Sequence, residues 1–184
     1  MKRLLVCTSL LFVATSLFAQ QKPPAGPPAS PPAKAELTVA GKSITVTYSS
    51  PKVNGRAGAI FGKDGLIGKD PSYPIWRAGA NAATVLHTDI TVTIGGVTVP
   101  KGSYSLWVDI TDPDGWVLVI NKQSGQWGRT YDKAQDLGTV KMTMDKAPEL
   151  VENLRYDLKD LGGGKVTLSL AWENRIASVP VTVQ

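Results

Sequence analysis

Side chains that could bind a ligand gather in two irregular stretches of the chain, around residues 56–81 and 121–131. They combine arginine, tryptophan and asparagine, and the candidate ligand-binding residues are Arg56, Trp76, Arg77, Asn81, Asn121 and Trp127. Arginine presents a planar fork of donors that matches a carboxylate or a phosphate, and tryptophan adds a flat apolar face. The combination predicts an anionic or carbohydrate-like ligand, with the same surface extended by Trp107, Lys122 and Arg129.

The same side chains could instead hold the fold together. Trp76 could belong to the core, Arg77 could pair with an acidic residue, and Asn81 could tie down its loop through backbone hydrogen bonds. The sequence leaves the binding and the structural interpretations open.

Few catalytic or metal-binding arrangements are available. The only cysteine is Cys7 and the only histidine is His87, which excludes histidine-pair zinc sites and, once a leader holding Cys7 is removed, thiol catalysis. Asp132, Asp136 and His87 remain as candidates for an envelope-polymer hydrolase, which is the main alternative to a binding domain. A purely structural or assembly module is the third hypothesis. No catalytic residue is assigned, and neither a metal nor another cofactor is expected.

The first part of the chain has the features of an export signal and a spacer. Lys2 and Arg3 precede a mostly apolar run over residues 4–18, which predicts a signal peptide at 1–19 and a periplasmic or extracellular destination. Residues 20–35 are rich in proline and alanine and are interpreted as a linker. A single domain then covers residues 36–184, and no membrane span is expected after signal cleavage.

The charge balance argues against a nucleic-acid partner. The net charge is +5 over 184 residues, and without Lys2 and Arg3 it is +3, from 18 basic and 15 acidic residues spread along the chain. A nucleic-acid-binding surface would need a clustered basic face. The segment 20–184 contains no cysteine, so its core must hold it together without disulfides.

Alternation of apolar and polar residues predicts strands through most of residues 36–184. A hairpin is expected over 36–50 with its turn at Gly41, and one strand over 86–94 before the Gly95-Gly96 turn. In the strand over 103–110, Trp107 falls on the polar face. About nine or ten short strands without a convincing helix predict an antiparallel β-sandwich or jelly roll, with a closed β-barrel as the alternative. In the sandwich, the two irregular stretches meet at one end.

The sequence also resembles a family of secreted bacterial proteins defined only as domain of unknown function 2911. The matching residues are Gly55-Arg56, Ile60-Phe61-Gly62, Trp76-Arg77, Gly79-Ala80-Asn81, Ala83-Thr84, Gly102, Tyr104-Ser105-Leu106, Trp116, Asn121-Lys122, Trp127-Gly128 and Ala171-Trp172. The resemblance runs from about residue 36 to the end of the chain and implies a secreted β-domain without an established activity. The chain departs from the family pattern at Ala78, where threonine is usual, and at Tyr73-Pro74, where the order is usually reversed.

Overall fold

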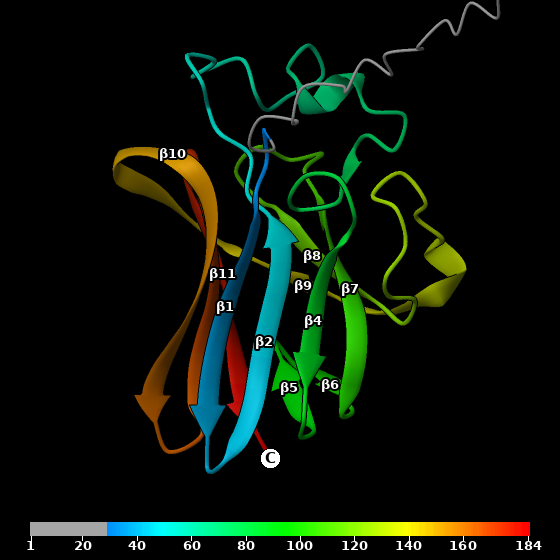
Figure 1. The fold of residues 1–184 in the computed structure, drawn as a ribbon, viewed down its shortest axis with the longest axis vertical. Helices are drawn as coiled ribbons and strands as arrows, with labels where there is room; N and C mark the ends of the chain where they lie inside the picture. Colours follow the sequence, from blue (N-terminus) through cyan, green and yellow to red (C-terminus); the bar gives the residue numbers. More distant parts are fainter. Residues whose placement is uncertain (1–28) are drawn as a thin grey trace, which may run out of the picture.

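Two antiparallel sheets pack face to face in the computed structural model, which describes residues 29–184 (Figure 1). The first sheet has the order β1-β2-β4-β7-β8-β9, with β3 paired to β7; the second has the order β10-β11-β5-β6. The strands of the first sheet are β1 (Pro32–Val39), β2 (Lys42–Ser49), β3 (Ile75–Trp76), β4 (Thr84–Thr88), β7 (Gly102–Asp109), β8 (Val117–Asn121) and β9 (Asp136–Lys141). Those of the second are β5 (Val92–Ile94), β6 (Val97–Val99), β10 (Thr143–Gly162) and β11 (Lys165–Val183).

The predicted β-sandwich is confirmed, with eleven strands where nine or ten were expected. Two three-residue 3₁₀ turns, η1 (Ile67–Lys69) and η2 (Lys133–Gln135), are the only helical segments in the described part of the chain. No helix within residues 29–184 is long and apolar enough to cross a membrane.

The alternative of a closed barrel is wrong. At the two sides of the sandwich, β1 lies beside β10 and β6 lies beside β9, but no ladder joins either pair of strands in the described part. A single bridge, between Lys52 and Asn153, connects the chain after β2 to β10. Because the sheets stay separate, their inner faces make one shared apolar core.

The core forms because each strand presents alternate apolar residues to it. Leu86, Leu106 and Leu118 of the first sheet join one buried cluster with Leu168 and Val179 of the second, and each of the five is at most 2% exposed. The described part contains no cysteine, so apolar burial is its main source of stability.

The strand predicted over residues 86–94 is in fact two strands in different sheets. Residues 84–88 form β4, and after a bend residues 92–94 form β5 in the opposite sheet. Thr88 begins the bend by donating its hydroxyl to the carbonyl of Ile90 at 2.6 Å. Alternation continues through this crossover because both strands face the same core, so the period of the sequence does not reveal the change of sheet.

The folded domain begins earlier than predicted, inside the proline-rich segment. Residues 32–35, assigned to the linker, belong to β1, and the backbone N–H of Ser50 donates to the carbonyl of Pro31 at 2.8 Å. Pro32 is tolerated because it starts an edge strand, where a missing N–H costs little. The predicted signal peptide and residues 20–28 of the predicted linker lie outside the described residues.

Trp107 has the predicted orientation but a different environment. It lies on the face of β7 that points away from the shared core, yet it is fully buried. Its ring is 5.2 Å from that of Tyr131, in the loop before β9, and its indole N–H donates to the hydroxyl of Ser105 at 2.8 Å. Trp107 therefore anchors that loop against the sheet and does not extend a binding surface.

The β1–β2 hairpin supplies a first test of the fold. Ala40 and Gly41 both have positive φ, 49° and 75°, as the two central residues of a tight hairpin turn do. We expect Ala40→Asn to stabilise the domain by about 0.5–1 kcal/mol, since asparagine tolerates this conformation better than alanine. Urea denaturation followed by circular dichroism measures the change. The control Thr38→Asn, at an exposed position of β1, should destabilise, and the same sign for both variants would contradict the turn assignment.

Candidate functional site

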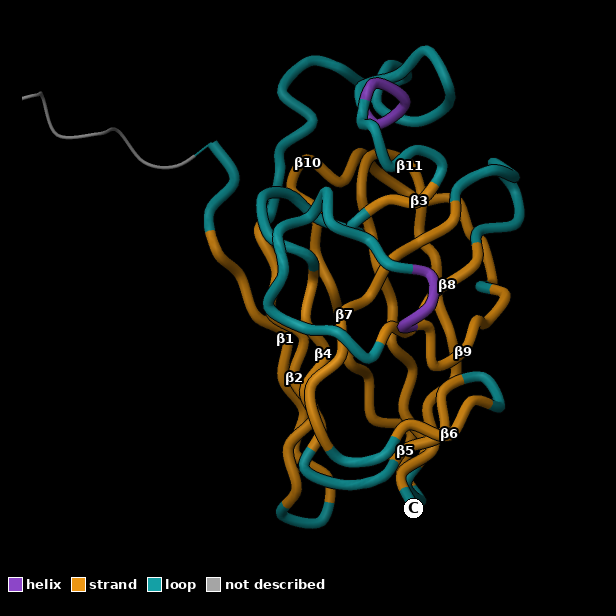
Figure 2. Tube along the Cα trace, turned by 90° about the vertical axis from the view of Figure 1, so that its right-hand side faces the viewer, coloured by secondary structure: helices purple, strands orange, loops and turns teal. Residues whose placement is uncertain are grey.

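The long loop between β2 and β3 covers the end of the sandwich opposite the C-terminus (Figures 1 and 2). Residues of this loop help to line a cavity of about 780 Å³. Its walls come from residues 29–31, 51–56, 66–70 and 76–80, together with Arg129 and Trp172. Segments far apart in the sequence therefore build it together.

Backbone pairing holds the β2–β3 loop on the body of the domain. The N–H of Val53 donates to the carbonyl of Glu152 at 2.8 Å, and the N–H of Leu154 donates to the carbonyl of Pro51 at 3.0 Å. Further along, Ile60 is fully buried and its carbonyl accepts from the N–H of Ile67 at 3.0 Å. These bonds and the burial of Ile60 fix the loop on the body of the domain.

The floor of the cavity is aromatic. Trp76 of β3 and Trp172 of β11 both line it, with ring centroids 5.9 Å apart and planes inclined by only 20°. Phe61 and Trp116 pack beside this pair, with their own ring centroids 4.9 Å apart. The centroid of Phe61 lies 5.8 Å from that of Trp76 and 5.7 Å from that of Trp172. The centroid of Trp116 lies 6.0 Å from that of Trp76. Both indoles of the floor are at least 96% buried, so the floor is rigid and apolar.

The two indole N–H groups of the floor differ. Trp76 donates to the carbonyl of Gly79 at 3.2 Å. The indole nitrogen of Trp172 is buried and has no hydrogen-bond partner within residues 29–184. A buried donor without an acceptor is unusual and costs about 1–3 kcal/mol.

Glu173 and Arg175 fasten the β2–β3 loop to β11. Glu173 is buried, has a positive φ of 59° where the register between β10 and β11 shifts, and accepts a short hydrogen bond from the N–H of Gly58. The guanidinium of Arg175 lies over the rings of Phe61 and Trp116, at 5.6 and 5.9 Å from their centroids. These contacts fix the loop whose other side forms the cavity wall.

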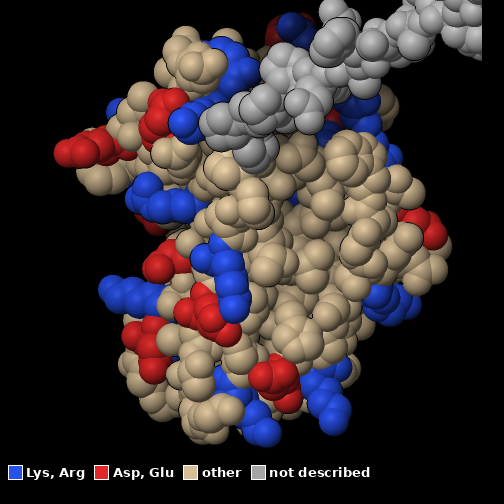
Figure 3. Space-filling view, in the orientation of Figure 1, with Lys and Arg blue, Asp and Glu red and all other residues tan. Residues whose placement is uncertain are grey.

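The walls above the floor are strongly basic. Five cationic side chains line the cavity against one carboxylate, that of Asp70; the cations are Lys52, Arg56, Lys69, Arg77 and Arg129. On the face of the molecule shown in Figure 3, by contrast, basic and acidic side chains are interspersed. The cavity therefore concentrates positive charge, whereas charges of both signs are mixed on that face.

Asp70 is held by two arginines and a serine. Its Oδ2 pairs with Arg77 and lies 3.5 Å from Nε of Arg129, while Oδ1 accepts from the N–H and the hydroxyl of Ser72 at 3.1 and 2.7 Å. Burial by itself would raise the pKa of Asp70, but the bonds from Ser72 and the two positive charges together lower it. Asp70 is thus an ionised structural partner of the arginines.

Arg77 and Arg56 are both positioned by backbone carbonyls. Arg77 donates from Nη1 to the carbonyl of Asn81 at 3.3 Å. Burial lowers the pKa of its guanidinium, and the negative charge of Asp70 raises it by less. A guanidinium stays protonated in proteins. Arg56 donates from Nε to Val53 at 2.9 Å and from Nη2 to Lys52 at 2.7 Å. Each guanidinium is therefore pre-oriented in the cavity wall.

Three of the six predicted ligand-binding residues line the cavity, namely Arg56, Trp76 and Arg77, and the other three lie elsewhere. Asn81 has a positive φ of 60°, and its side chain donates to the hydroxyl of Ser49 at 3.3 Å. Trp127 is 57% exposed and pairs through its backbone with Ala82. The two irregular stretches do meet as predicted, because the N–H of Gly128 donates to the carbonyl of Asn81 at 3.1 Å.

Asn121 serves the loop between β8 and β9. It is fully buried, and its Nδ2 donates to the carbonyl of Asp132 and to Oδ1 of Asp136, both at 2.8 Å. Asp136 also accepts the hydroxyl of Tyr131 at 2.7 Å, and Asp132 caps η2 by accepting from the N–H of Ala134. Both carboxylates of the hydrolase alternative thus carry structural hydrogen bonds, and neither lines the cavity among the described residues.

His87 lies within reach of a serine and an aspartate, as in a hydrolytic triad. Its Nδ1 is 2.9 Å from the hydroxyl of Ser103, and its Nε2 is 3.2 Å from Oδ1 of Asp89. The side chains of His87 and Asp89 are both 48% exposed, and none of the three residues lines the cavity described above. The arrangement is a hydrogen-bonded surface group outside that cavity.

Among the charged and aromatic residues that line the cavity, four were not predicted to bind a ligand: Trp172, Lys52, Lys69 and Asp70. Trp172 continues the apolar alternation of a core strand, so nothing in the sequence distinguishes it from a residue that only packs in the core. The two lysines and Asp70 lie in a glycine-rich loop whose path the sequence does not specify. The one available clue was the density of charged residues around Arg56 within that loop.

A model of the family described as "Protein of unknown function (DUF2911)" matches residues 30–181. The chain belongs to the DUF2911 family. The family resemblance drawn from the sequence motifs is confirmed, and the residues matched by the family model include all of the cavity lining except Ala29. No curated protein and no solved structure matches the chain.

The two floor tryptophans of this DUF2911 domain should respond differently to loss of the indole N–H. Both Trp76→Phe and Trp172→Phe shrink the floor, but only the first leaves a carbonyl, that of Gly79, without its donor. We expect Trp76→Phe to be the less stable variant by about 1–2 kcal/mol. Urea denaturation followed by circular dichroism compares them, and equal stabilities would refute the hydrogen-bond assignment.

The ion pair of Asp70 predicts a pH-dependent contribution to stability. Since the pKa of Asp70 is lower in the folded state, its contribution is present above the unfolded pKa and is lost as the pH falls through the folded pKa. We expect Asp70→Asn to cost about 1–3 kcal/mol at pH 7, and we expect this cost to shrink as the pH falls below about 4 toward the lower folded-state pKa. Denaturation curves at several pH values measure this gap. Asp64→Asn, in the same loop but exposed, should show no such dependence.

Proposed function

We propose that this DUF2911 domain is a binding protein whose cavity takes an anionic small molecule with a flat apolar or sugar-like body. The observation that supports the proposal best is the lining itself, with five cations and one carboxylate above two stacked indoles. The cavity volume of about 780 Å³ falls within the range of about 300–1,000 Å³ typical of small-molecule sites.

The chemistry of the walls favours binding over hydrolysis. Asp70 is the only carboxylate among the described lining residues, and it is already paired with Arg77 and Arg129. A general acid or base needs a carboxyl or imidazole group free to exchange a proton with the substrate. Arginine side chains in the walls above an apolar floor instead hold carboxylates or phosphates, because charge-assisted hydrogen bonds are stronger in surroundings of low dielectric constant.

The predicted signal peptide at residues 1–19 suggests where such a ligand would be met. We propose that the domain is exported to the periplasm or beyond and binds an acidic glycan, or a fragment of one, from the cell envelope. Uronic acids and sugar phosphates combine an anionic group with a flat ring face, which suits basic walls above an aromatic floor.

Calorimetry and thermal unfolding of the domain test this function. The probes are galacturonate, glucose 6-phosphate and benzoate, with neutral galactose as the uncharged control. A probe present at 100 times its Kd should stabilise the domain by about 2.7 kcal/mol. We expect the anions to bind and galactose to bind much more weakly.

Matched lysine variants locate the binding. Lys52→Ala combined with Lys69→Ala should weaken anion binding about tenfold, since each removes a charge from the cavity wall. Lys101→Ala combined with Lys165→Ala removes the same charge from exposed positions outside the lining and should leave affinity unchanged. Failure of all three anions to bind at millimolar concentration, or equal losses in both double variants, would refute the proposal.

A further inference from the structure

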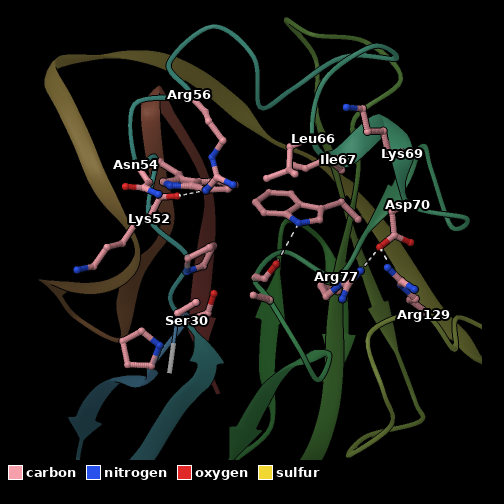
Figure 4. A pocket seen from close by; sticks show the side chains of 17 residues that line it. Ser30, Lys52, Asn54, Arg56, Leu66, Ile67, Lys69, Asp70, Arg77 and Arg129 are labelled. Atoms are coloured by element: carbon pink, nitrogen blue, oxygen red, sulfur yellow. Dashed lines mark hydrogen bonds and ion pairs between the residues drawn. The ribbon is translucent and has the colours of Figure 1, made fainter. Parts of the chain in front are cut away.

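The cations of the cavity form two groups on opposite sides of the close-up view (Figure 4). Lys52 and Arg56, which we call the β2 pole, lie on one side of the close-up view. Lys69, Arg77 and Arg129, which we call the β3 pole, lie on the other side together with Asp70. The two poles are therefore separate in the molecule as well as in the view.

The two poles are anchored independently of each other. Arg56 bonds to the carbonyls of Val53 and Lys52, within its own segment. Arg77 and Arg129 both reach Asp70, which connects the end of η1 to the segment after β3 and to the β8–β9 loop. No hydrogen bond or ion pair between described residues joins one pole to the other.

Each pole keeps the same surplus of positive charge and has donors available. The β2 pole has two cations and no carboxylate, while the β3 pole has three cations and the carboxylate of Asp70. Arg56 uses two of its five N–H donors on the backbone carbonyls named above. Arg129 is 59% exposed, and its Nε contact with Asp70 is long at 3.5 Å. An anion can therefore be bound at either pole without breaking the core.

The space between the poles suits an uncharged group. Leu66 and Ile67 lie between the poles in Figure 4, and Trp76 and Trp172 line the same cavity, so a charge placed there would lose hydration without gaining a partner. A ligand with one anionic group can satisfy only one pole and leaves the positive charge of the other uncompensated. A ligand with two anionic groups at opposite ends satisfies both poles and places its middle on the aromatic floor.

We infer that the cavity is built for an elongated dianion, with two carboxylate or phosphate groups at opposite ends of a flat ring body. This inference rests on the proposed function, since it specifies the ligand class of the same cavity. Two sources share the chemistry: a small aromatic dicarboxylate, and a short acidic glycan with an anionic group on each of two sugars.

The test is a calorimetric comparison of matched probes. Benzoate carries one carboxylate, phthalate carries two on adjacent carbons, and terephthalate carries two at opposite ends of the same ring. Galacturonate and digalacturonate make the corresponding sugar pair, with a neutral disaccharide as the size control. We expect at least one opposite-ended dianion, terephthalate or digalacturonate, to bind at least tenfold more tightly than its monoanion and than phthalate. The probe series in which the opposite-ended dianion binds more tightly, aromatic or sugar, identifies the source of the ligand.

Variants at the two poles test whether both ends are held. Lys52→Ala at the β2 pole and Lys69→Ala at the β3 pole should each weaken the opposite-ended dianion about three- to tenfold, and the double variant should lose about the product. For the monoanion, only the variant at the pole that it occupies should have an effect. Lys101→Ala, outside the cavity lining, should leave every affinity unchanged.

The outcomes separate this inference from the proposed function. Monoanions that bind as tightly as their opposite-ended dianions, or a dianion affected by only one pole variant, would overturn the two-pole inference and leave anion binding in place. Absence of binding by every anion would instead remove the proposed function itself. If the neutral disaccharide binds as tightly as digalacturonate, the gain of digalacturonate over galacturonate comes from its size and not from its second charge, which counts against the two-pole inference.

Discussion

The stacking of Trp76 on Trp172 is the contact on which the rest of this end of the molecule depends. Trp76 belongs to the first sheet and Trp172 to the second, so the pair joins the two sheets where no ladder hydrogen bonds do. Phe61 from the β2–β3 loop and Trp116 from the start of β8 complete the cluster. Burial of four large rings contributes several kilocalories per mole, on the order of 1.5–3 kcal/mol for each ring that is fully buried. The same cluster closes the core and makes the cavity floor.

This floor determines how the basic residues can be arranged. Cations brought together repel one another, and burial of any one of them is costly unless a partner compensates. The molecule meets this constraint by holding guanidinium groups with backbone carbonyls at Arg56 and with a carboxylate at Arg77. The remaining positive charge stays at the rim, on the partly exposed Arg129 and on the lysines. A preorganised site of this kind binds an anion without having to assemble its donors.

The sequence reveals the strands because side-chain alternation follows directly from their geometry. It therefore predicts the sandwich, the β1–β2 hairpin and the outward orientation of Trp107. It also predicts that the two irregular stretches meet, since loops at one end of a sandwich are neighbours. It could not separate the residues that line the cavity from those that fasten the loops. Arg77 and Asn81 are four positions apart, yet one faces the cavity and the other supports a turn, because backbone φ at Asn81 redirects the chain.

The way the two sheets meet also affects how this domain behaves among other copies of itself. A sheet edge offers unpaired N–H and C=O groups on which a foreign strand can grow, and such growth leads to amyloid. Here the four edges lie in two adjacent pairs, β1 beside β10 and β6 beside β9. Each edge thus restricts access to its neighbour, and Pro32 and the charged Lys34 further blunt β1. Resistance to aggregation follows from the architecture without any closure of the sheets into a ring.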